Sequence, residues 1–353
     1  MTKIKKMSIQ IGKIDGSILR LLVAFVVVTA FGSIIRPEIF LSLQNFESIT
    51  RQMPVFSLLA LGVGVCMIAG GIDLSTVYIA NLTSISLALF MIRFEASTGT
   101  GEILLVAVAI LLGLLIGTLC GVFNGFLVAK MKIPAMLATL GTQQLFLGIG
   151  IVISEGSTIS GVPETFMVFD SMIFGLIPFP FVLFILAVIL LTFIMKRTKL
   201  GERIYLVGSN ERSSKFAGIK VNMTLIKAYA MSGILASLAG IISLSTLRTA
   251  NASFYGSFIM ISILVVVLGG INPNGGFGNI IGIALGALVL QVLSSLLNMF
   301  PAISNFYRDL IWGGTLIAVL IINFVVDKDR YKKAMKKVAR EAVGMKKPEE
   351  TEI

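Results

Sequence analysis

Residues 103–128 read ILLVAVAILLGLLIGTLCGVFNGFLV, an apolar run that contains no charged side chain. A helix needs about 20 mainly apolar residues to cross the hydrocarbon core of a bilayer, so this run predicts a membrane-spanning helix with room to tilt. Its glycines recur at every fourth position and share one face of the helix: Gly113, Gly117, Gly121 and Gly125. Small residues let helices approach closely in lipid. We expect this face to pack against another helix of the same chain; a dimerisation face is the alternative.

The rest of the chain has the same character. Hydrophobic residues make up 56% of it, charged residues 13%, and the mean hydropathy is +0.97, whereas a soluble domain carries about 25% charged residues. These values exclude a soluble fold. Apolar runs predict an all-α membrane bundle of about ten transmembrane helices, near 18–35, 54–70, 74–92, 103–128, 135–153, 177–195, 225–246, 257–270, 279–299 and 308–326. A second set of glycines with the same spacing accompanies the ninth run: Gly278, Gly282 and Gly286.

The distribution of basic residues predicts the orientation of the chain. If the amino terminus is cytoplasmic and ten spans alternate, the only Lys or Arg residues outside are Arg36, Arg51, Arg93, Arg248 and Arg308. All others then face the cytoplasm, as the positive-inside rule requires. We therefore expect both termini in the cytoplasm. The expected parts are a cytoplasmic segment at 1–17, a transmembrane domain at 18–326 with a cytoplasmic loop at 196–224, and a basic cytoplasmic tail at 327–353.

The residues that the chain lacks exclude several kinds of chemistry. It contains no histidine, so a His-based nucleophile, proton relay or metal site cannot form. It has no G-x-x-x-x-G-K-[ST] motif with which to cradle ATP. The two cysteines, Cys66 and Cys120, lie in apolar runs and are better interpreted as packed side chains than as redox groups. We expect no catalytic residue, metal or cofactor on this chain, and an energy source in another protein if transport is active.

Residues 69–75, AGGIDLS, interrupt the second and third predicted helices. Two adjacent glycines weaken a helix by about 1 kcal/mol each relative to alanine, and Asp73 is well placed to cap the helix that follows. A carboxylate near mid-bilayer costs about 3 kcal/mol, so Asp73 should lie at an interface or face a polar cavity. Two interpretations stay open: a tight capped turn, or a direct role of Asp73 in solute passage or gating.

The cytoplasmic loop contains the pattern of a short helix with both ends specified. Asn210 is a good N-cap, Glu211 and Lys215 complement the helix dipole, and Gly218 suits the left-handed position after the helix. We predict a two-turn helix near 211–217. A partner protein that binds and moves such a helix between two spans would tilt both spans. The alternative is an ordinary basic connector.

Two further features concern turns and polar side chains. Residues 269–278, GGINPNGGFG, predict a tight cytoplasmic turn after the eighth span, because no helix continues through this composition. Polar residues also occur within or at the end of apolar runs, where they either line a passage for a sugar or bond neighbouring helices. These residues are Asn124, Thr139, Thr142, Gln143 and Gln144.

Together these segments resemble the permease subunits of ribose-type and related simple-sugar ABC importers, a family that includes the autoinducer-2 importer permeases. The matching strings are GGIDLS at 70–75; Asn124-Gly125 followed by KIP at 132–134 and ATLG at 138–141; Gly208 with Asn210-Glu211 and AGI at 217–219; and LGG at 268–270 with Gly275, Gly276 and Gly278. They occur in order, and the resemblance covers roughly residues 20–326.

The resemblance implies a subunit that forms the pathway for a monosaccharide, ribose or a related simple sugar, across the bacterial plasma membrane. It implies alternating access between inward-open and outward-open states. The implied partners are a second permease subunit, a cytoplasmic ABC ATPase that binds ATP and magnesium, and a sugar-binding protein outside; nucleic acid is not a partner. By resemblance the ATPase is coupled through Gly208, Asn210, Glu211, Ala217, Gly218 and Ile219, and the residues of the pathway or gate are Asp73, Asn124, Thr139, Gln143 and Gln144.

The chain departs from the family pattern in three places. Thr76-Val77 follows the serine where the family usually has Gly-Val, Ser213 and Ser214 replace alanines, and residues 256–260 lack the acidic residues of many relatives. The lining of the pathway therefore stays open, as does the choice between a pair of identical and a pair of unlike permeases. Other possible functions are autoinducer-2 or nucleoside import by the same family, a stand-alone secondary transporter, a channel, or a membrane scaffold that transports nothing.

Overall fold

The computed structural model describes residues 16–94, 100–173, 175, 177–300, 307, 310–317 and 321. The chain divides into two compact units, residues 1–304 and 305–353, and the fold described below is that of the first. Its α-helices are α1 (Gly16–Ile35), α2 (Pro37–Phe40), α3 (Leu43–Ile68), α4 (Thr76–Arg93), α5 (Thr100–Ala129), α6 (Ala135–Ile153), α7 (Phe179–Arg197), α8 (Lys199–Ser209), α9 (Glu211–Phe216), α10 (Val221–Leu247), α11 (Phe258–Leu268) and α12 (Ile280–Asn298). The other elements are the 3-10 helix η1 (Glu164–Asp170) and the strands β1 (Ile159–Ser160), β2 (Met172–Ile173), β3 (Ile177–Pro178) and β4 (Thr249–Ala250).

Eight of the described helices are long and apolar enough to cross a membrane: α1, α3, α4, α5, α6, α7, α10 and α12. Helix α11 coincides with the eighth predicted run, but it has only 11 residues. The predicted runs between residues 18 and 299 thus each correspond to a helix. The tenth run, near 308–326, falls in the second unit, where residues 310–317 are helical and most of the remainder lies outside the described residues.

Helix α3 begins well before the apolar run that predicts it. The run starts near residue 54, whereas the helix starts at Leu43, after the N-cap Ser42, whose hydroxyl accepts a hydrogen bond from the backbone N–H of Asn45 at 3.1 Å. The first turns carry polar side chains that interact with one another, including an ion pair of 3.0 Å between Arg51 and Glu47. A helix start of this kind depends on capping and on side-chain pairs, and hydropathy therefore does not detect it.

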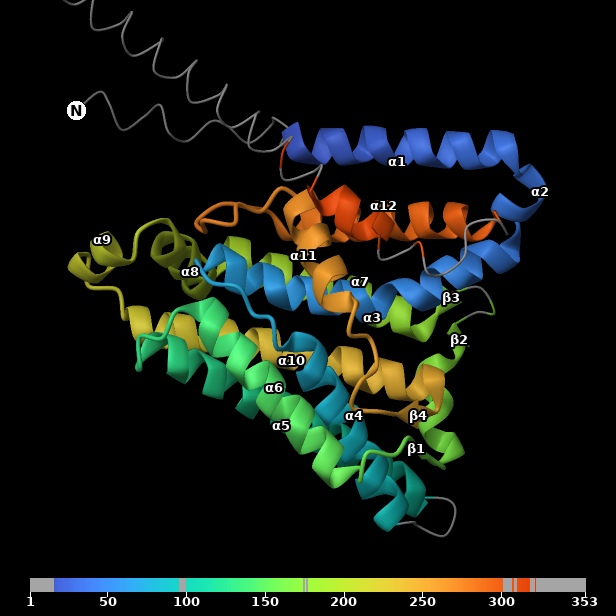
Figure 1. Ribbon diagram of the computed structural model, residues 1–353, viewed down its shortest axis with the longest axis horizontal. Helices are drawn as coiled ribbons and strands as arrows, with labels where there is room; N and C mark the ends of the chain where they lie inside the picture. Colours follow the sequence, from blue (N-terminus) through green and yellow to red (C-terminus); the bar gives the residue numbers. More distant parts are fainter. Residues whose placement is uncertain are drawn as a thin grey trace, which may run out of the picture. The chain divides into compact units, whose positions relative to one another are not determined.

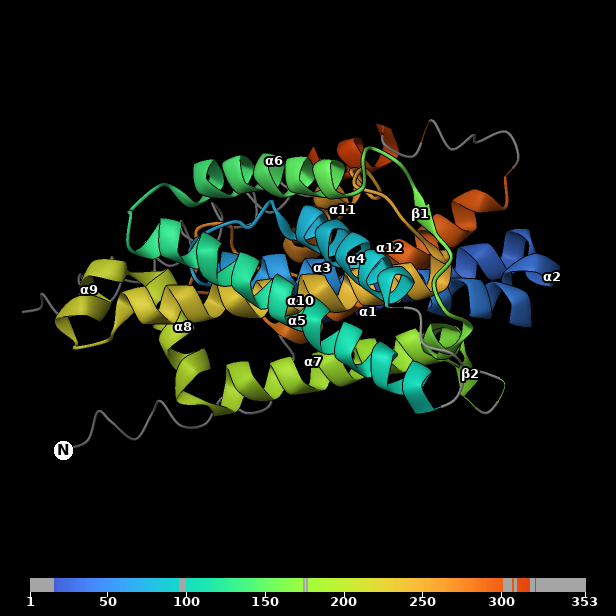
Figure 2. The ribbon, with the colours of Figure 1, turned by 90° about the horizontal axis from the view of Figure 1, so that it is seen from below.

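The bundle has two differently built ends (Figures 1 and 2). Helices α8 and α9 lie at one end, called here the α8–α9 end, and the four short strands lie at the opposite one, called the strand end. Strand β1 pairs antiparallel with β4, with Ile159 opposite Ala250, and β2 pairs antiparallel with β3. The first pair connects the segment between α6 and α7 to the segment that follows α10.

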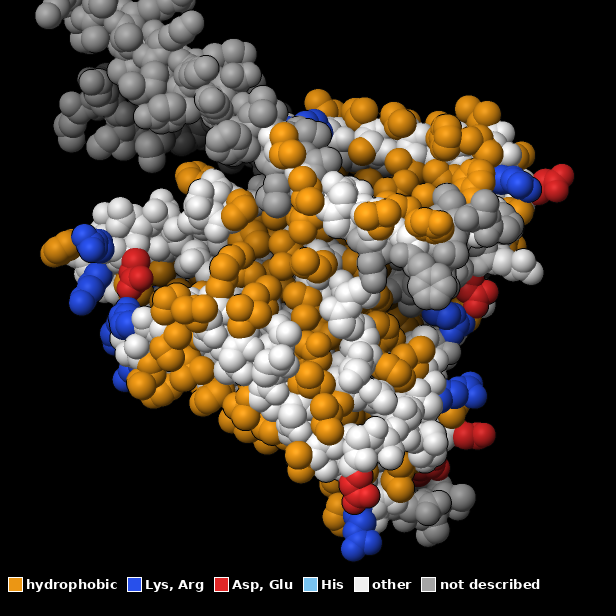
Figure 3. Space-filling model, viewed as in Figure 1, with side chains coloured by type: hydrophobic (Ala, Val, Ile, Leu, Met, Phe, Trp, Pro, Cys, Tyr) orange, Lys and Arg blue, Asp and Glu red, His pale blue; other side chains and the backbone are white. Residues whose placement is uncertain are grey.

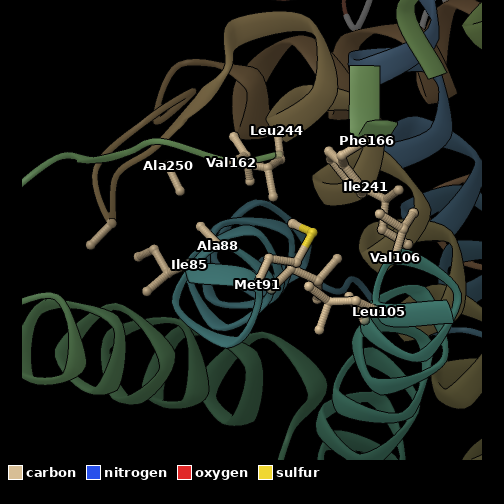
Figure 4. Packing of buried hydrophobic residues seen from close by; sticks show 13 residues of the cluster. Ile85, Ala88, Met91, Leu105, Val106, Val162, Phe166, Ile241, Leu244 and Ala250 are labelled. Carbon is tan, nitrogen blue, oxygen red and sulfur yellow. The ribbon is translucent and has the colours of Figure 1, made fainter. Parts of the chain in front are cut away.

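A buried hydrophobic cluster lies near the strand end (Figure 4). Its side chains come from α4, α5, α10, η1 and the segments around β1 and β4, and they include Met91, Val106, Phe166 and Ile241. Ser245 of α10 also donates a hydrogen bond of 3.0 Å to the carbonyl of Phe166. These contacts hold the connection between α6 and α7 against the bundle.

Burial separates central helices from peripheral ones. Of the most apolar window of each helix, 89% is buried for α3 and 67% for α10, but only 11% for α1 and 22% for α7. On the face shown in Figure 3, apolar side chains cover the middle, while Lys, Arg, Asp and Glu gather towards the two ends. Peripheral helices with exposed apolar side chains and charged ends are what a bilayer requires. Helices α3, α4, α10 and α12, of which 61–89% of this window is buried, form the core.

The glycines of α5 lie at contacts within the chain. A Cβ atom added to Gly117 would collide with the carbonyl oxygen of Gly233 in α10, and one added to Gly121 would collide with the carbonyl oxygen of Tyr229. Cβ atoms at the other two positions would lie 2.6 Å from neighbouring atoms: Ile226 Cα for Gly125 and Leu87 Cδ1 for Gly113. The stripe therefore packs mainly on α10, and on α4 at one position.

The glycines of the α11–α12 hairpin make similar contacts. A Cβ atom on Gly282 would collide with the carbonyl oxygen of Gly269, and one on Gly286 would lie 3.0 Å from the carbonyl oxygen of Val265. Gly278, at a φ of +142°, precedes α12 and lies against Ile271. These three glycines thus allow α12 to approach the end of α11.

We predict that Gly117→Val destabilises the folded chain, because the new side chain must displace the α10 backbone. Overpacking costs about 1–3 kcal/mol, so the unfolding temperature in detergent should fall by several degrees. Cys66 and Cys120 are free and buried, and a thiol-reactive dye therefore reports unfolding. The matched control is Gly148→Val on α6, where no heavy atom lies within 4 Å of the added Cβ. Equal melting of both variants would contradict close α5–α10 packing.

Candidate functional site

Three glycine-containing segments that are far apart in the sequence meet at the α8–α9 end. They are the loop after α3, the end of α8 and the turn between α11 and α12. The N–H of Gly276 donates to the carbonyl of Ile68 at 2.9 Å. A Cβ atom on Gly208 would collide with that carbonyl oxygen, and one on Gly275 would lie 2.7 Å from Gly70 Cα. These four glycines and Ile68 are called the glycine junction.

Glycine is needed at the junction for conformation as well as for space. The φ angle is +93° at Gly70, +85° at Gly275 and +75° at Gly276, a region that side chains other than glycine rarely adopt. Helix α8 is attached to the same turn by Tyr205, whose hydroxyl donates to the carbonyl of Gly278 at 2.8 Å. Helix α8 therefore contacts both the end of α3 and the turn that leads into α12.

Helix α8 was not expected from the sequence, which indicated a loop at 196–224. Its N-cap is Thr198, whose hydroxyl accepts a hydrogen bond of 3.3 Å from the N–H of Gly201. Its buried residues, Gly201, Ile204 and Val207, recur every third residue on one face, which is the pattern of an amphipathic helix lying on a protein surface. The helix is too short and too polar to be found by its hydropathy.

Helix α9 confirms the predicted short helix and both of its ends. The side-chain oxygen of Asn210 accepts a hydrogen bond of 2.9 Å from the N–H of Ser213. At the other end Gly218 has a φ of +80°, and the N–H groups of Gly218 and Ile219 each donate to carbonyls of the helix at 3.1 Å. This is the Schellman arrangement, which ends a helix at a left-handed residue.

The surface of α9 carries one ion pair and one exposed aromatic residue. Lys132, in the loop between α5 and α6, contacts Glu211 with an Nζ–Oε1 distance of 2.9 Å. Phe216 is 93% exposed, although aromatic side chains are usually at least half buried. Sequence reasoning missed Phe216. The available signal was a single aromatic residue in an otherwise polar helix.

The six residues predicted to couple to an ATPase fall into two groups. Gly208 is partly buried and lies at the glycine junction. The other five lie on α9 or directly beside it, and all are exposed except Ile219, which is partly buried: Asn210, Glu211, Ala217, Gly218 and Ile219. A pocket of about 360 Å³ lies between the end of α8 and the loop after α5. The Lys132–Glu211 ion pair links the two sides of this pocket.

A buried polar cluster surrounds Asp73, between α3 and α4. One carboxylate oxygen accepts hydrogen bonds from the Ser75 backbone N–H at 3.1 Å and from the Ser75 hydroxyl at 2.7 Å. The other accepts from Ser232 of α10 at 2.8 Å. The side-chain amide of Asn124 in α5 lies 3.5 Å from Asp73 and donates to the Ser75 hydroxyl at 2.7 Å. All four residues are buried.

The cluster joins three parts of the chain through one carboxylate. Hydrogen bonds to a charged group contribute about 1.5–3 kcal/mol each, and they satisfy a group that is otherwise expensive to bury. The bond from the Ser75 N–H closes the turn before α4, as the turn interpretation requires, but Asp73 is not the N-cap of that helix: the N-cap is Ser75, which makes no side-chain cap bond. Ser232 was missed, because serine is common in membrane helices and nothing in the sequence connects it to Asp73.

Helix α6 carries the other polar candidates. Thr139 is buried and donates to the carbonyl of Ile72 at 3.0 Å, which places it beside the Asp73 segment. Thr142 bonds within its own helix. Gln143 is partly buried and Gln144 is exposed, so the structure does not bring them into the Asp73 cluster.

These observations define a multi-pass membrane protein with a short, exposed helix at one end. The family described as "Branched-chain amino acid transport system / permease component" matches residues 45–320. The chain therefore belongs to this permease family.

Individual relatives carry more specific names. The chain is 34% identical over 292 residues to the ribose import permease protein RbsC of Bacillus subtilis, covering 82% of this chain and 87% of the relative. It is 30% identical over 304 residues to the D-allose transport system permease protein AlsC of Escherichia coli, with 86% and 90% covered. Identity to the autoinducer 2 import system permease protein LsrD of Salmonella paratyphi A is 31% over 301 residues, with 83% and 87% covered. No solved structure matches the chain.

We predict that Asp73→Ala lowers the unfolding temperature more than Asp73→Asn. Alanine leaves the donors of Ser75 and Ser232 without their acceptor, and each unsatisfied buried group costs about 1–3 kcal/mol. Asparagine keeps one side-chain oxygen as an acceptor. The thiol-dye assay measures both variants. If Asp73→Ala melts like the unmodified chain, the cluster does not stabilise the bundle.

Proposed function

We propose that the chain is the permease subunit of a monosaccharide importer in a bacterial plasma membrane, and that a separate cytoplasmic ATPase supplies the energy. The main support for this proposal is the structure of helix α9. It is capped at both ends, exposes Phe216 at 93%, and follows a helix that is packed on the glycine junction. Exposed aromatic side chains on a fixed helix are suited to filling a pocket of a partner protein.

The charges of the two ends support a cytoplasmic position for the α8–α9 end. The segments at or near this end are the loop between α5 and α6 and the stretch from the end of α7 to the start of α10 (Figure 1). They carry Lys130, Lys132, Lys196, Arg197, Lys199, Arg203, Arg212, Lys215, Lys220 and Lys227. In the first unit the segments at the strand end carry only Arg36, Arg51, Arg93 and Arg248 among the described basic residues. The positive-inside rule then orients the bundle. About ten spans with both termini in the cytoplasm agree with this orientation, and the strand end faces the sugar-binding protein.

Movement of α9 reaches the membrane helices through α8 and through an ion pair, besides its direct continuation into α10. Through α8 it acts on the end of α3 and on the turn before α12, because Gly208 and Tyr205 contact these segments directly. Through the Glu211–Lys132 ion pair it acts on the loop between α5 and α6. An ATPase that binds α9 differently in two of its own states would change the relative free energies of two permease conformations. The chain itself needs no catalytic group for this.

The substrate class follows from the relatives and from the charges of the chain. Relatives are named for ribose, D-allose and autoinducer 2. The family description names branched-chain amino acids, whose zwitterions need charged partners in a membrane. Asp73, between α3 and α4, is buried and accepts hydrogen bonds from Ser75 and Ser232. The charged side chains of the described spans lie towards helix ends. A neutral polyol therefore fits better than an amino acid.

The exposed face of α6 is where a second permease subunit would pack. Gln144 is exposed, and Cβ atoms at Gly141 and Gly148 would meet no heavy atom within 4 Å. An amide facing lipid tails is costly, whereas it is satisfied by another helix or by a passage that holds water and sugar. The second subunit is either a copy of this chain or an unlike permease.

The central test is reconstitution in proteoliposomes. The chain together with an ATPase and a sugar-binding protein from the same organism is expected to take up sugar only when ATP is present. The chain alone is expected to move no sugar under a proton or sodium gradient. Ion-driven uptake by the chain alone would overturn the proposal in favour of a secondary transporter.

We predict that Gly218→Val inserts and folds normally but abolishes sugar-stimulated ATP hydrolysis. Valine strongly disfavours the φ of +80° at this position, so the end of α9 must rearrange. No heavy atom lies within 4 Å of the added Cβ, which limits the effect to the backbone. The control, Gly156→Val, has a φ of +71°, equally open surroundings and a place near the strand end. If both variants retain stimulation, α9 does not couple the ATPase.

We predict that Phe216→Ala weakens the affinity of the chain for the ATPase by tenfold or more. Loss of a central aromatic anchor typically costs over 1.4 kcal/mol of binding free energy. Phe94, which is 60% exposed and follows α4, provides the control Phe94→Ala. Affinity is measured by surface plasmon resonance on the detergent-solubilised chain. Equal affinities for both variants would show that Phe216 is not part of the docking surface.

A further inference from the structure

The α8–α9 end contains a second pocket whose lining is strongly basic. It has a volume of about 430 Å³ and lies between the loop after α5, helix α9 and the start of α10. Its charged lining residues are Lys130, Lys132, Lys215, Lys220 and Glu211. We call this the lysine pocket. Four lysines face a single carboxylate in it, so the lining carries a net charge of +3.

Most of this charge is not neutralised within the described part of the chain. Glu211 pairs with Lys132, and no described carboxylate forms an ion pair with Lys130, Lys215 or Lys220. Three like charges around one hollow repel one another unless an anion lies between them. The lining therefore favours a negatively charged occupant.

The start of α10 adds to this preference. The first turn of α10 contains no acidic residue, and its N-cap, Lys220, makes no side-chain cap hydrogen bond. Val221, Asn222 and Met223 of this turn line the pocket. The amino-terminal end of a helix carries a partial positive charge, which suits phosphate oxygens.

The surroundings identify a lipid as the source of the anion. Helix α5 ends at Ala129, one residue before Lys130, and its last turns expose Phe123 at 41% and Phe126 at 42%. Met131 and Met223, beside the pocket, are 59% and 50% exposed. The pocket therefore lies where an apolar, lipid-facing surface ends. A phospholipid headgroup in the pocket would leave its acyl chains along α5, whereas a soluble anion makes no use of this apolar surface.

We propose that the lysine pocket binds the phosphate of an anionic phospholipid, which thereby bridges the end of α5, helix α9 and the start of α10. Basic pockets at the cytoplasmic ends of membrane helices suit such headgroups. A bound lipid would neutralise the repulsion between lysines of three segments and hold α9 close to the bundle. This makes the coupling helix sensitive to the charge of the membrane around it.

The test uses the full chain, purified in neutral detergent, with phosphatidylglycerol and phosphatidylcholine of identical acyl chains. Binding is measured by native mass spectrometry. The pocket variant combines Lys130→Gln, Lys215→Gln and Lys220→Gln. The control variant combines Lys196→Gln, Arg197→Gln and Lys199→Gln, which removes the same charge at the junction of α7 and α8, outside the pocket.

We expect the unmodified chain and the control variant to retain phosphatidylglycerol in preference to phosphatidylcholine. Each lysine contributes about fivefold, so the pocket variant should bind phosphatidylglycerol about a hundredfold more weakly. An equal loss in the control variant would overturn the proposal, because the attraction would then be diffuse. Displacement of the lipid by millimolar inorganic phosphate would assign the pocket to a soluble anion instead.

Normal lipid binding by the pocket variant, combined with loss of the ATPase, would assign the lysines to protein docking and also overturn the proposal. The lipid measurement uses this chain alone. It can therefore succeed even if the assignment of α9 to an ATPase fails.

Discussion

The closest contacts at the α8–α9 end are between backbones, and the arrangement of that end depends on them. The carbonyl of Ile68 accepts a hydrogen bond from Gly276 and lies where a side chain on Gly208 would be. Three chain segments can share this space only because each presents a glycine. In a bilayer, where helices gain little from burying apolar surface against one another, such close approach is a main source of cohesion. The contact also leaves little room for independent movement of α8.

Because this end is rigid, movement of the short α9 helix is transmitted to the bundle. A helix of six residues would have little effect on a bundle if it were connected by flexible loops. Here its amino-terminal side continues from α8 across the single residue Asn210, and α8 is attached to α3 and to the α11–α12 turn. Its carboxyl-terminal side leads through the Schellman turn into α10, a core helix. Helix α9 is therefore connected to the core on both sides, through α8 to α3 and directly to α10.

Elements governed by local sequence could be predicted, and contacts between distant segments could not. The caps of α9 depend on Asn210 and Gly218 and their immediate neighbours, so the sequence determines them. The glycine stripe of α5 predicts a close contact, but not that the partner is Gly233 and the backbone around it. Helix α8 was missed because its apolar face has only three buried positions. The predicted candidates around Asp73 divide in the same way: Asn124 and Thr139 lie near it, whereas Gln143 and Gln144 face elsewhere.

The separation of Asp73 and Ser232 along the chain has a consequence for biosynthesis. They are 159 residues apart, so Asp73 leaves the ribosome and enters the translocon long before α10 has been made. Ser75 is present from the start of this interval and Asn124 follows 51 residues after Asp73, so Ser232 is the last partner to be made. Nascent chains stalled before residue 232 should therefore keep the α3–α4 segment accessible to water, and the late arrival of α10 would complete its insertion.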